Sequence, residues 1–292
     1  MSLTEFFQTN PGFFVAFVVI LGLIIGSFIN VVIYRLPIML EKQWREQCRE
    51  LLGYGEKDVT ESSEPFNLIV PRSRCPHCGQ LIKAFSNIPV ISFLVQKGKC
   101  SECNLPISIR YPVVEILSAL MAAVVAIHYG LSYETLFAIV LTWSLIILSF
   151  IDLDHQILPD DIIYPVLWLG LIVNMFGLFT DIYSSLIGSI LGYTILWTVF
   201  IVFKLLTGKE GMGYGDFKLL ALLGAWLGWQ AIPLIILVSS LMGALIGISL
   251  ILFAKRDKGI PIPFGPYLAL AGWIALLWGN ELNVMYISAV TR

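Results

Sequence analysis

The chain has 292 residues, of which 58% are hydrophobic and only 13% are charged, and its formal net charge is −2. A soluble domain carries about 25% charged residues, so this composition excludes an ordinary soluble protein of one or two domains. The mean hydropathy of +0.85 indicates a chain that crosses a lipid bilayer several times. The small net charge identifies no partner, and we expect no nucleic acid among the partners.

Eight apolar segments are predicted to be transmembrane helices, because several approach the roughly 20 residues that a helix needs to cross a bilayer. The first lacks the basic start and the cleavage site of a signal peptide, so we expect it to be retained. The predicted spans are residues 12–34, 112–130, 135–151, 162–179, 185–206, 217–228, 231–254 and 266–279. The sequence therefore predicts an all-α polytopic membrane protein. Three Gly-x3-Gly pairs, at 188/192, 224/228 and 243/247, predict close helix packing.

One long polar stretch, residues 35–110, follows the first span and is predicted to form a small loop domain. Within it, residues 40–52 repeat apolar side chains at spacings of three and four, which predicts an amphipathic helix. Cys48 lies on the apolar face, so we expect a buried thiol there and not a metal ligand. The expected division is an N-terminal helix at 1–34, the loop domain at 35–110 and a transmembrane core at 111–292.

Two cysteine pairs in the loop have the spacing of a metal site. Cys75-x2-Cys78 and Cys100-x2-Cys103 are separated by 21 residues, close to the usual spacing in zinc ribbons. Four thiolates fill a tetrahedral shell and leave no open position, which favours a structural zinc over a catalytic one. The alternative, two disulfides, requires an oxidising compartment.

The distribution of Lys and Arg predicts the orientation. Eleven of the 18 fall in residues 35–110, and six more lie in loops that an eight-span count places on the same side: Lys204, Lys209, Lys218, Lys255, Arg256 and Lys258. Only Arg292 falls on the opposite side. By the positive-inside rule, the large loop is expected in the cytosol and both termini outside.

Three polar residues lie at span ends near the loop. Ser27 and Asn30 are near the end of the first span, and we favour hydrogen bonding between helices for both over direct chemistry. Glu115 enters the second span just after Arg110. It lies either at the membrane interface or in a buried pair with a basic group.

Two aspartates mark the candidate active site. Asp152 ends the third span, and Asp216 follows Gly213-Tyr214-Gly215 at the start of the sixth, on the same side of the membrane. An ionisable group at membrane depth is expensive and is by default a functional-site hypothesis. Two small residues before Asp216 are expected to let the backbone turn sharply and approach an extended substrate closely.

Further aspartates in the acidic loop after the third span compete for these roles. Asp154 is a rival to Asp152, while Asp160 or Asp161 can cap the next helix. Position alone favours Asp216 for chemistry over a solvated interface charge.

Five stretches, in this order, resemble the type IV prepilin leader peptidases, a family of polytopic membrane aspartic proteases with a Gly-x-Gly-Asp motif. They are residues 26–37 (GSFINVVIYRLP), the two cysteine pairs, Asp152, the turn at 213–216 and residues 261–267 (PIPFGPY). The resemblance spans nearly the whole chain. It implies that Asp152 and Asp216 are the catalytic pair, with Gly213, Gly215 and Asp154 in support.

The resemblance also implies the substrate and a second activity. Family members cut the basic leader from type IV prepilins or pseudopilins, which serve pili or type II secretion, at the cytosolic face of the bacterial inner membrane. They often methylate the new N-terminus with S-adenosylmethionine, and the four-cysteine loop typically accompanies that activity. The position of a methyl-donor site is left open.

Paired carboxylates suit peptide hydrolysis, because one takes a proton from water while the other, still protonated, polarises the scissile carbonyl. One alternative is a membrane aspartic protease without methyltransferase activity. Another, from a different class, is a proton- or cation-coupled transporter. Against the transporter, the aspartates lie at helix ends and no inverted repeat is visible.

Overall fold

The computed structural model describes residues 3–53, 66–75, 77–82, 88–253 and 262–290. Pro76, Pro261, residues 255–258 and Arg292 lie outside the described residues. The chain forms two compact units, Met1–Ile127 and His128–Arg292. Within the described ranges the regular structure is helical, with two isolated β-bridges and no strand.

Each of the eight predicted spans corresponds to a helix, which confirms an all-α membrane protein. The helices are α1 (Leu3–Thr9), α2 (Pro11–Leu52), α3 (Ile91–Val95), α4 (Arg110–Tyr129), α5 (Tyr133–His155), α6 (Asp160–Asn174), α7 (Ile182–Thr207), α8 (Tyr214–Leu227), α9 (Ile232–Phe253) and α10 (Gly265–Val290). Five described segments are long and apolar enough to cross a membrane: α2, α4, α5, α7 and residues 229–249. The helices α6 and α8 and the apolar part of α10, Gly265–Gly279, are shorter. Eight crossings therefore remain a prediction.

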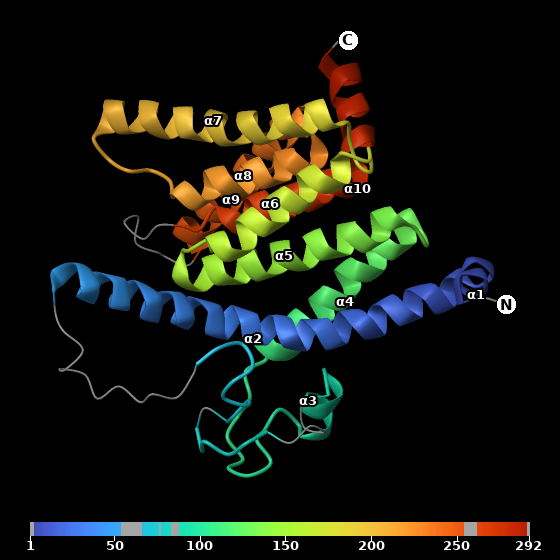
Figure 1. Cartoon of the computed structure of the whole chain (residues 1–292), viewed down its shortest axis with the longest axis vertical. Coiled ribbons are helices and arrows are strands. Elements are labelled where there is room, and N and C mark those ends of the chain that lie inside the picture. The colour runs from blue at the N-terminus through green and yellow to red at the C-terminus, as the bar shows by residue number, and fades with distance from the viewer. Residues whose placement is uncertain (1–2, 54–65, 76, 83–87, 254–261, 291–292) are drawn as a thin grey trace. The chain divides into compact units, whose positions relative to one another are not determined.

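In the first unit, α2 runs unbroken through 42 residues, so the two helices expected at 12–34 and 40–52 are one (Figure 1). Pro37 lies inside this helix and removes one backbone hydrogen bond. Pro37 and its neighbours Leu36 and Leu40 are buried, and this packing offsets the loss. Cys48, farther along, is exposed. The expectation of a buried thiol was wrong, because the end of α2 extends beyond the packed part of the unit.

The helices α2 and α4 meet along a line of small residues. A Cβ added to Gly22 would lie 2.7 Å from Ala119 Cα, and one added to Gly26 would lie 2.7 Å from Glu115 Cα. One turn further on, Asn30 Nδ2 donates to a backbone oxygen at the start of α4 at 3.1 Å. The prediction that Asn30 serves hydrogen bonding between helices is confirmed.

In the second unit, α8 is the central helix, and every residue from Leu219 to Trp226 is buried. The backbone of α7 lies directly against it, since Cβ atoms on Gly188 or Gly192 would collide with the carbonyl oxygens of Gly224 and Leu220 (Figure 1). Close packing is confirmed for these glycines. Gly247 does not show it, because among the described residues a Cβ there would meet an isoleucine methyl group at 3.4 Å, an ordinary contact distance.

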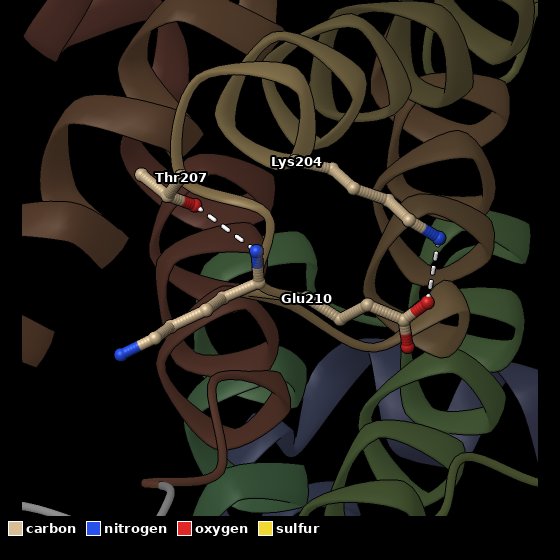
Figure 2. A network of polar contacts seen from close by, with 4 residues as sticks. Lys204, Thr207 and Glu210 are labelled. Atoms are coloured by element: carbon tan, nitrogen blue, oxygen red, sulfur yellow. Dashed lines mark hydrogen bonds and ion pairs between the residues drawn. The ribbon is translucent and has the colours of Figure 1, made fainter.

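The α7–α8 connection is held by local polar contacts. Gly208 ends α7 in the left-handed conformation with a φ of 69°. Beyond it, the backbone N–H of Lys209 donates to Thr207 Oγ1 at 3.3 Å, and Lys204 Nζ pairs with Glu210 at 2.7 Å (Figure 2). These side chains are exposed, as expected for a loop in water, and the chain then enters the turn at Gly213.

Candidate active site and metal centre

Asp152 lies in the last turn of α5, where its side chain is buried with 5% of the residue exposed. The helix ends because Gln156 adopts a left-handed conformation, with a φ of 54°, and donates its N–H to the Asp152 carbonyl at 2.9 Å. The Asp152 carboxylate accepts a hydrogen bond from the backbone N–H of Gly265, at 3.0 Å from Oδ2.

Asp216 lies in the first turn of α8, two residues after the helix begins at Tyr214. Only 7% of the residue is exposed, and Phe217 beside it is fully buried. The first turn of a helix favours a negative charge, because its backbone N–H groups point toward it.

The two aspartates come together although they lie on different helices. The Asp216 carboxyl group interacts electrostatically with Asp152. Leu158 packs between the surrounding elements: a Cβ on Gly215 would lie 2.7 Å from Leu158 Cβ, and one on Gly265 would lie 3.3 Å from Leu158 Cδ1. The end of α5 and the starts of α8 and α10 therefore meet at one point.

The glycines of the motif do not form a sharp turn; what distinguishes them is how much room a side chain would have at each position. Gly213 has a φ of −80° and a ψ of 149°, which any residue adopts, and Gly215 has no positive φ either. The expectation of a glycine-dependent turn was wrong. A Cβ on Gly215 would collide with Leu158, whereas for one on Gly213 the nearest contact among the described residues is Asp216 Oδ2 at 3.9 Å. Gly213 is also exposed.

The other aspartates lie outside the pair. Asp154 is exposed, and Asp160 forms an ion pair with Lys218 at 2.7 Å. The N-cap of α6 is Pro159, without a side-chain cap, so the prediction that Asp160 or Asp161 caps this helix was wrong. Both occupy its first turn, where a carboxylate is favourable.

The four loop cysteines form a cluster that fits a tetrahedral metal ion. The Sγ atoms of Cys75, Cys78, Cys100 and Cys103 all lie within 4.8 Å of one another, and those of Cys75 and Cys103 are 3.9 Å apart. A tetrahedral zinc with Zn–S bonds of 2.3 Å requires S···S distances of about 3.8 Å. The cluster therefore needs little rearrangement to hold zinc, and Cys48 is not part of it.

The two cysteine pairs sit on equivalent backbone turns, a local duplication that the sequence did not reveal. The N–H of Cys75 donates to the Gln80 carbonyl and that of Cys100 to the Leu105 carbonyl, both at 2.9 Å. The residue after each second cysteine is left-handed, with φ values of 70° at Gly79 and 56° at Asn104. The repeat is hard to see in the sequence because asparagine replaces glycine in the second turn.

The thiols of this cluster have divergent acidities. Hydrogen bonds from the backbone of Cys78 and His77 lower the pKa of Cys75 to about 6. A backbone hydrogen bond at Leu105 acts in the same direction on Cys103, but burial and the neighbouring thiols raise the pKa of Cys103 to about 11. Crowded thiols resist ionising together, and a bound cation removes this conflict.

Two polar groups have partners that the sequence did not predict. Glu115 is buried and accepts a hydrogen bond from the backbone N–H of Val90 at 2.7 Å and another from Ser27. Among the described contacts of Glu115, these two replace the suggested pair with a basic group, which stays a prediction. Gly265 belongs to the stretch PIPFGPY, and no sequence signal links it to Asp152.

Comparisons with known proteins agree over nearly the whole chain. Residues 20–129 match the bacterial peptidase A24 N-terminal domain, and residues 139–248 match the type IV leader peptidase family. Proteins named prepilin leader peptidase/N-methyltransferase are similar to this chain. The one from Pseudomonas putida is 54% identical over 97% of this chain and 96% of its own length.

Other organisms contain similar proteins that carry the name prepilin leader peptidase/N-methyltransferase. The one from Stutzerimonas stutzeri is 52% identical over 98% of both chains, and the one from Legionella pneumophila is 43% identical over 95% of this chain and 96% of its own length. No solved structure matches. At these identities and this coverage, the chain belongs to the type IV leader peptidase family.

Proposed function

We propose that this protein removes the leader peptide of type IV prepilins or pseudopilins by hydrolysis at the Asp152–Asp216 pair and methylates the new N-terminus. The observation that supports this most strongly is the convergence of two buried, interacting aspartates at helix ends. The relatives named prepilin leader peptidase/N-methyltransferase are similar over nearly the full length of the chain, and their name supports both activities.

The pair suits hydrolysis because two close carboxylates resist ionising together and share one proton. The charged carboxylate removes a proton from a water molecule, and the protonated one polarises the scissile carbonyl. Collapse of the tetrahedral intermediate needs a proton on the leaving amine, which the pair also supplies. The open space beside Gly213 gives an extended peptide backbone access to Asp216.

The loop cysteines would hold a structural zinc ion, and the methyl donor would be S-adenosylmethionine. Zinc bound by four thiolates has no free position, so it shapes the loop and takes no part in bond cleavage. S-adenosylmethionine supplies the methyl group that the new N-terminal amine accepts. A protease without methyltransferase activity is less favoured, because the relatives are named for both activities.

The orientation follows from the basic residues. With the loop of residues 35–110 in the cytosol, the aspartates lie at the cytosolic face of the bacterial inner membrane and both termini are periplasmic. Prepilin leaders are basic and remain on the cytosolic side, so the scissile bond lies on the same side of the membrane as the aspartate pair. Asp152 and Asp216 lie within one turn of a helix end, which disfavours a transporter with mid-membrane carboxylates.

The test is mass spectrometry of a prepilin produced together with the enzyme, which reports leader loss and N-terminal methylation separately. Asp152→Asn and Asp216→Asn should each reduce cleavage roughly a thousandfold or more, because neither step proceeds without its carboxylate. The matched control is Asp154→Asn, at an exposed position on the same helix, which should retain most of the activity.

Substantial cleavage by either Asp152→Asn or Asp216→Asn, in protein shown to be folded and inserted, removes that residue from the pair. Cleavage without methylation in the wild-type enzyme, at saturating methyl donor, would leave only the protease half of the proposal.

A further inference from the structure

The start of α10 is built around the carboxylate of Asp152. The backbone N–H of Gly265 donates to Asp152 Oδ2 at 3.0 Å, and this buried contact joins residues 113 positions apart in the chain. Both residues belong to the second unit. The first residue of one helix thus contacts a carboxylate in the last turn of another.

The N–H of Gly265 is free for this contact because the helix does not use it. The first N–H groups of a helix have no acceptor within it. Tyr267 and Leu268 donate to the Phe264 carbonyl at 3.1 and 3.2 Å, and Pro266 has no N–H to offer. Gly265 therefore supplies the unused donor at the positive end of α10.

Space, and not backbone conformation, requires glycine at this position. Gly265 does not have a positive φ. A Cβ there would lie 2.7 Å from Asp152 Oδ2 and 3.2 Å from its Cγ. Any other residue would push the carboxylate away from the N–H that it accepts.

We propose that Gly265 is a positioning residue whose N–H keeps Asp152 as the charged member of the pair, so that Asp152 is the base and Asp216 carries the proton. The inference rests on the proposed peptidase function. A fixed N–H donor favours the ionised form of the carboxylate that it contacts. The C-terminal end of α5 carries a partial negative charge, which disfavours a negative charge on Asp152, and the Gly265 N–H counteracts this effect.

The groups around the pair favour the charge on Asp152 and the proton on Asp216. Asp216 also has a backbone N–H donor, that of Gly213, but Gly213 is exposed to solvent, whereas the donor to Asp152 is buried. Lys218 on α8 is engaged with Asp160 on α6 at 2.7 Å. The other charged groups on α5 and α6 near the pair are exposed: Asp154, His155 and Asp161.

The assignment gives a balanced reaction. Asp152 takes one proton from water as the water oxygen bonds to the scissile carbon, and Asp216 gives its proton to the carbonyl oxygen. The C–N bond then breaks as Asp152 passes its proton to the amine nitrogen. A hydroxyl of the tetrahedral intermediate returns a proton to Asp216, which restores the starting state with one water consumed.

The decisive variant replaces Gly265 by glycolic acid, introduced by nonsense suppression. This changes the N–H to an ester oxygen and adds no atom that could clash. We expect kcat to fall about 10- to 100-fold, as for loss of a hydrogen bond to a charged group, with little change in KM. The acidic limb of the pH–kcat profile should move to higher pH by about one to two units.

A matched control and a readout without turnover accompany this variant. Gly243→Ala alters a glycine that faces Phe264 and Tyr267, where a Cβ has room at 3.4 Å or more, and should leave kcat and the pH profile unchanged. Infrared titration of the Asp152 carboxyl group, in an Asp216→Asn background, measures the effect of the N–H directly. Its midpoint should move to higher pH in the ester variant.

An unchanged infrared midpoint in the ester variant would overturn the role of Gly265 whatever happens to cleavage. So would a wild-type pH profile and kcat in the ester enzyme. A wild-type enzyme that cuts no prepilin would instead overturn the proposed function, and the infrared titration would still decide whether Gly265 stabilises the charge on Asp152.

Discussion

At the scale of single residues, the candidate site is shaped by where side-chain atoms are absent. Gly215 and Gly265 are close to Leu158 and Asp152, with added Cβ contacts of 2.7 Å. Gly213 belongs to the same motif but has room for a Cβ. One motif thus contains a glycine required by packing and a glycine that packing does not require, and substitution separates the two.

Gly215→Ala should destabilise the protein by about 1–3 kcal/mol, as overpacking typically does, and should lower kcat because Asp216 moves with its helix. Gly213→Ala should change stability by less than about 0.5 kcal/mol and impair cleavage mainly through KM, because the methyl group projects where substrate approaches. Thermal unfolding in detergent and steady-state cleavage measure both effects. Equal loss of stability in the two variants would contradict this account.

At the scale of elements, three helix ends meet at the proposed active site. Asp152 is at the end of α5, and Asp216 and Gly265 are at the starts of α8 and α10. The sequence predicted the helices and both aspartates, because apolar runs and charges at their ends are local signals. It did not predict the contact between Asp152 and Gly265, since no local pattern reports a meeting of residues 113 positions apart.

Local signals also misjudged α2. The sequence divided it into a span at 12–34 and an amphipathic helix at 40–52, but burial of Leu36, Pro37 and Leu40 keeps the helix continuous. The amphipathic pattern of residues 40–52 placed Cys48 on a buried face, and the structure leaves it exposed. Tertiary packing, which the pattern cannot report, decided both outcomes.

The cysteine turns give a prediction at the same scale. Protein purified without chelators should contain about one zinc per chain, bound by Cys75, Cys78, Cys100 and Cys103, as expected for a four-thiolate site. Cys100→Ser should remove most of the metal, because it breaks the shell, whereas the exposed Cys48→Ser should leave the metal content unchanged. Elemental analysis with thiol titration distinguishes the outcomes. Metal-free protein with two disulfides would reverse the zinc assignment and the orientation together.

At the scale of the whole molecule, the two sites lie in different compact units. The cysteine cluster belongs to Met1–Ile127 and the aspartate pair to His128–Arg292. The family matches divide similarly, at residues 20–129 and 139–248. Among the described residues, the contacts of the aspartate pair come from the second unit. Damage to one site therefore need not damage the chemistry of the other.

Replacing Cys75 and Cys78 together by Ser should lower activity by disordering the loop, because metal binding is coupled to folding of the module that holds it. Substrate docking and methyl transfer should suffer more than hydrolysis, so KM should rise more than kcat falls. Conversely, Asp216→Asn should keep its zinc and still methylate a substrate supplied already cleaved. Leader loss and methylation must be measured separately in both variants, with insertion verified. If the double cysteine variant, still inserted, cut nothing even at saturating substrate, the hydrolytic site would depend on the loop, and the two units would have to act as one.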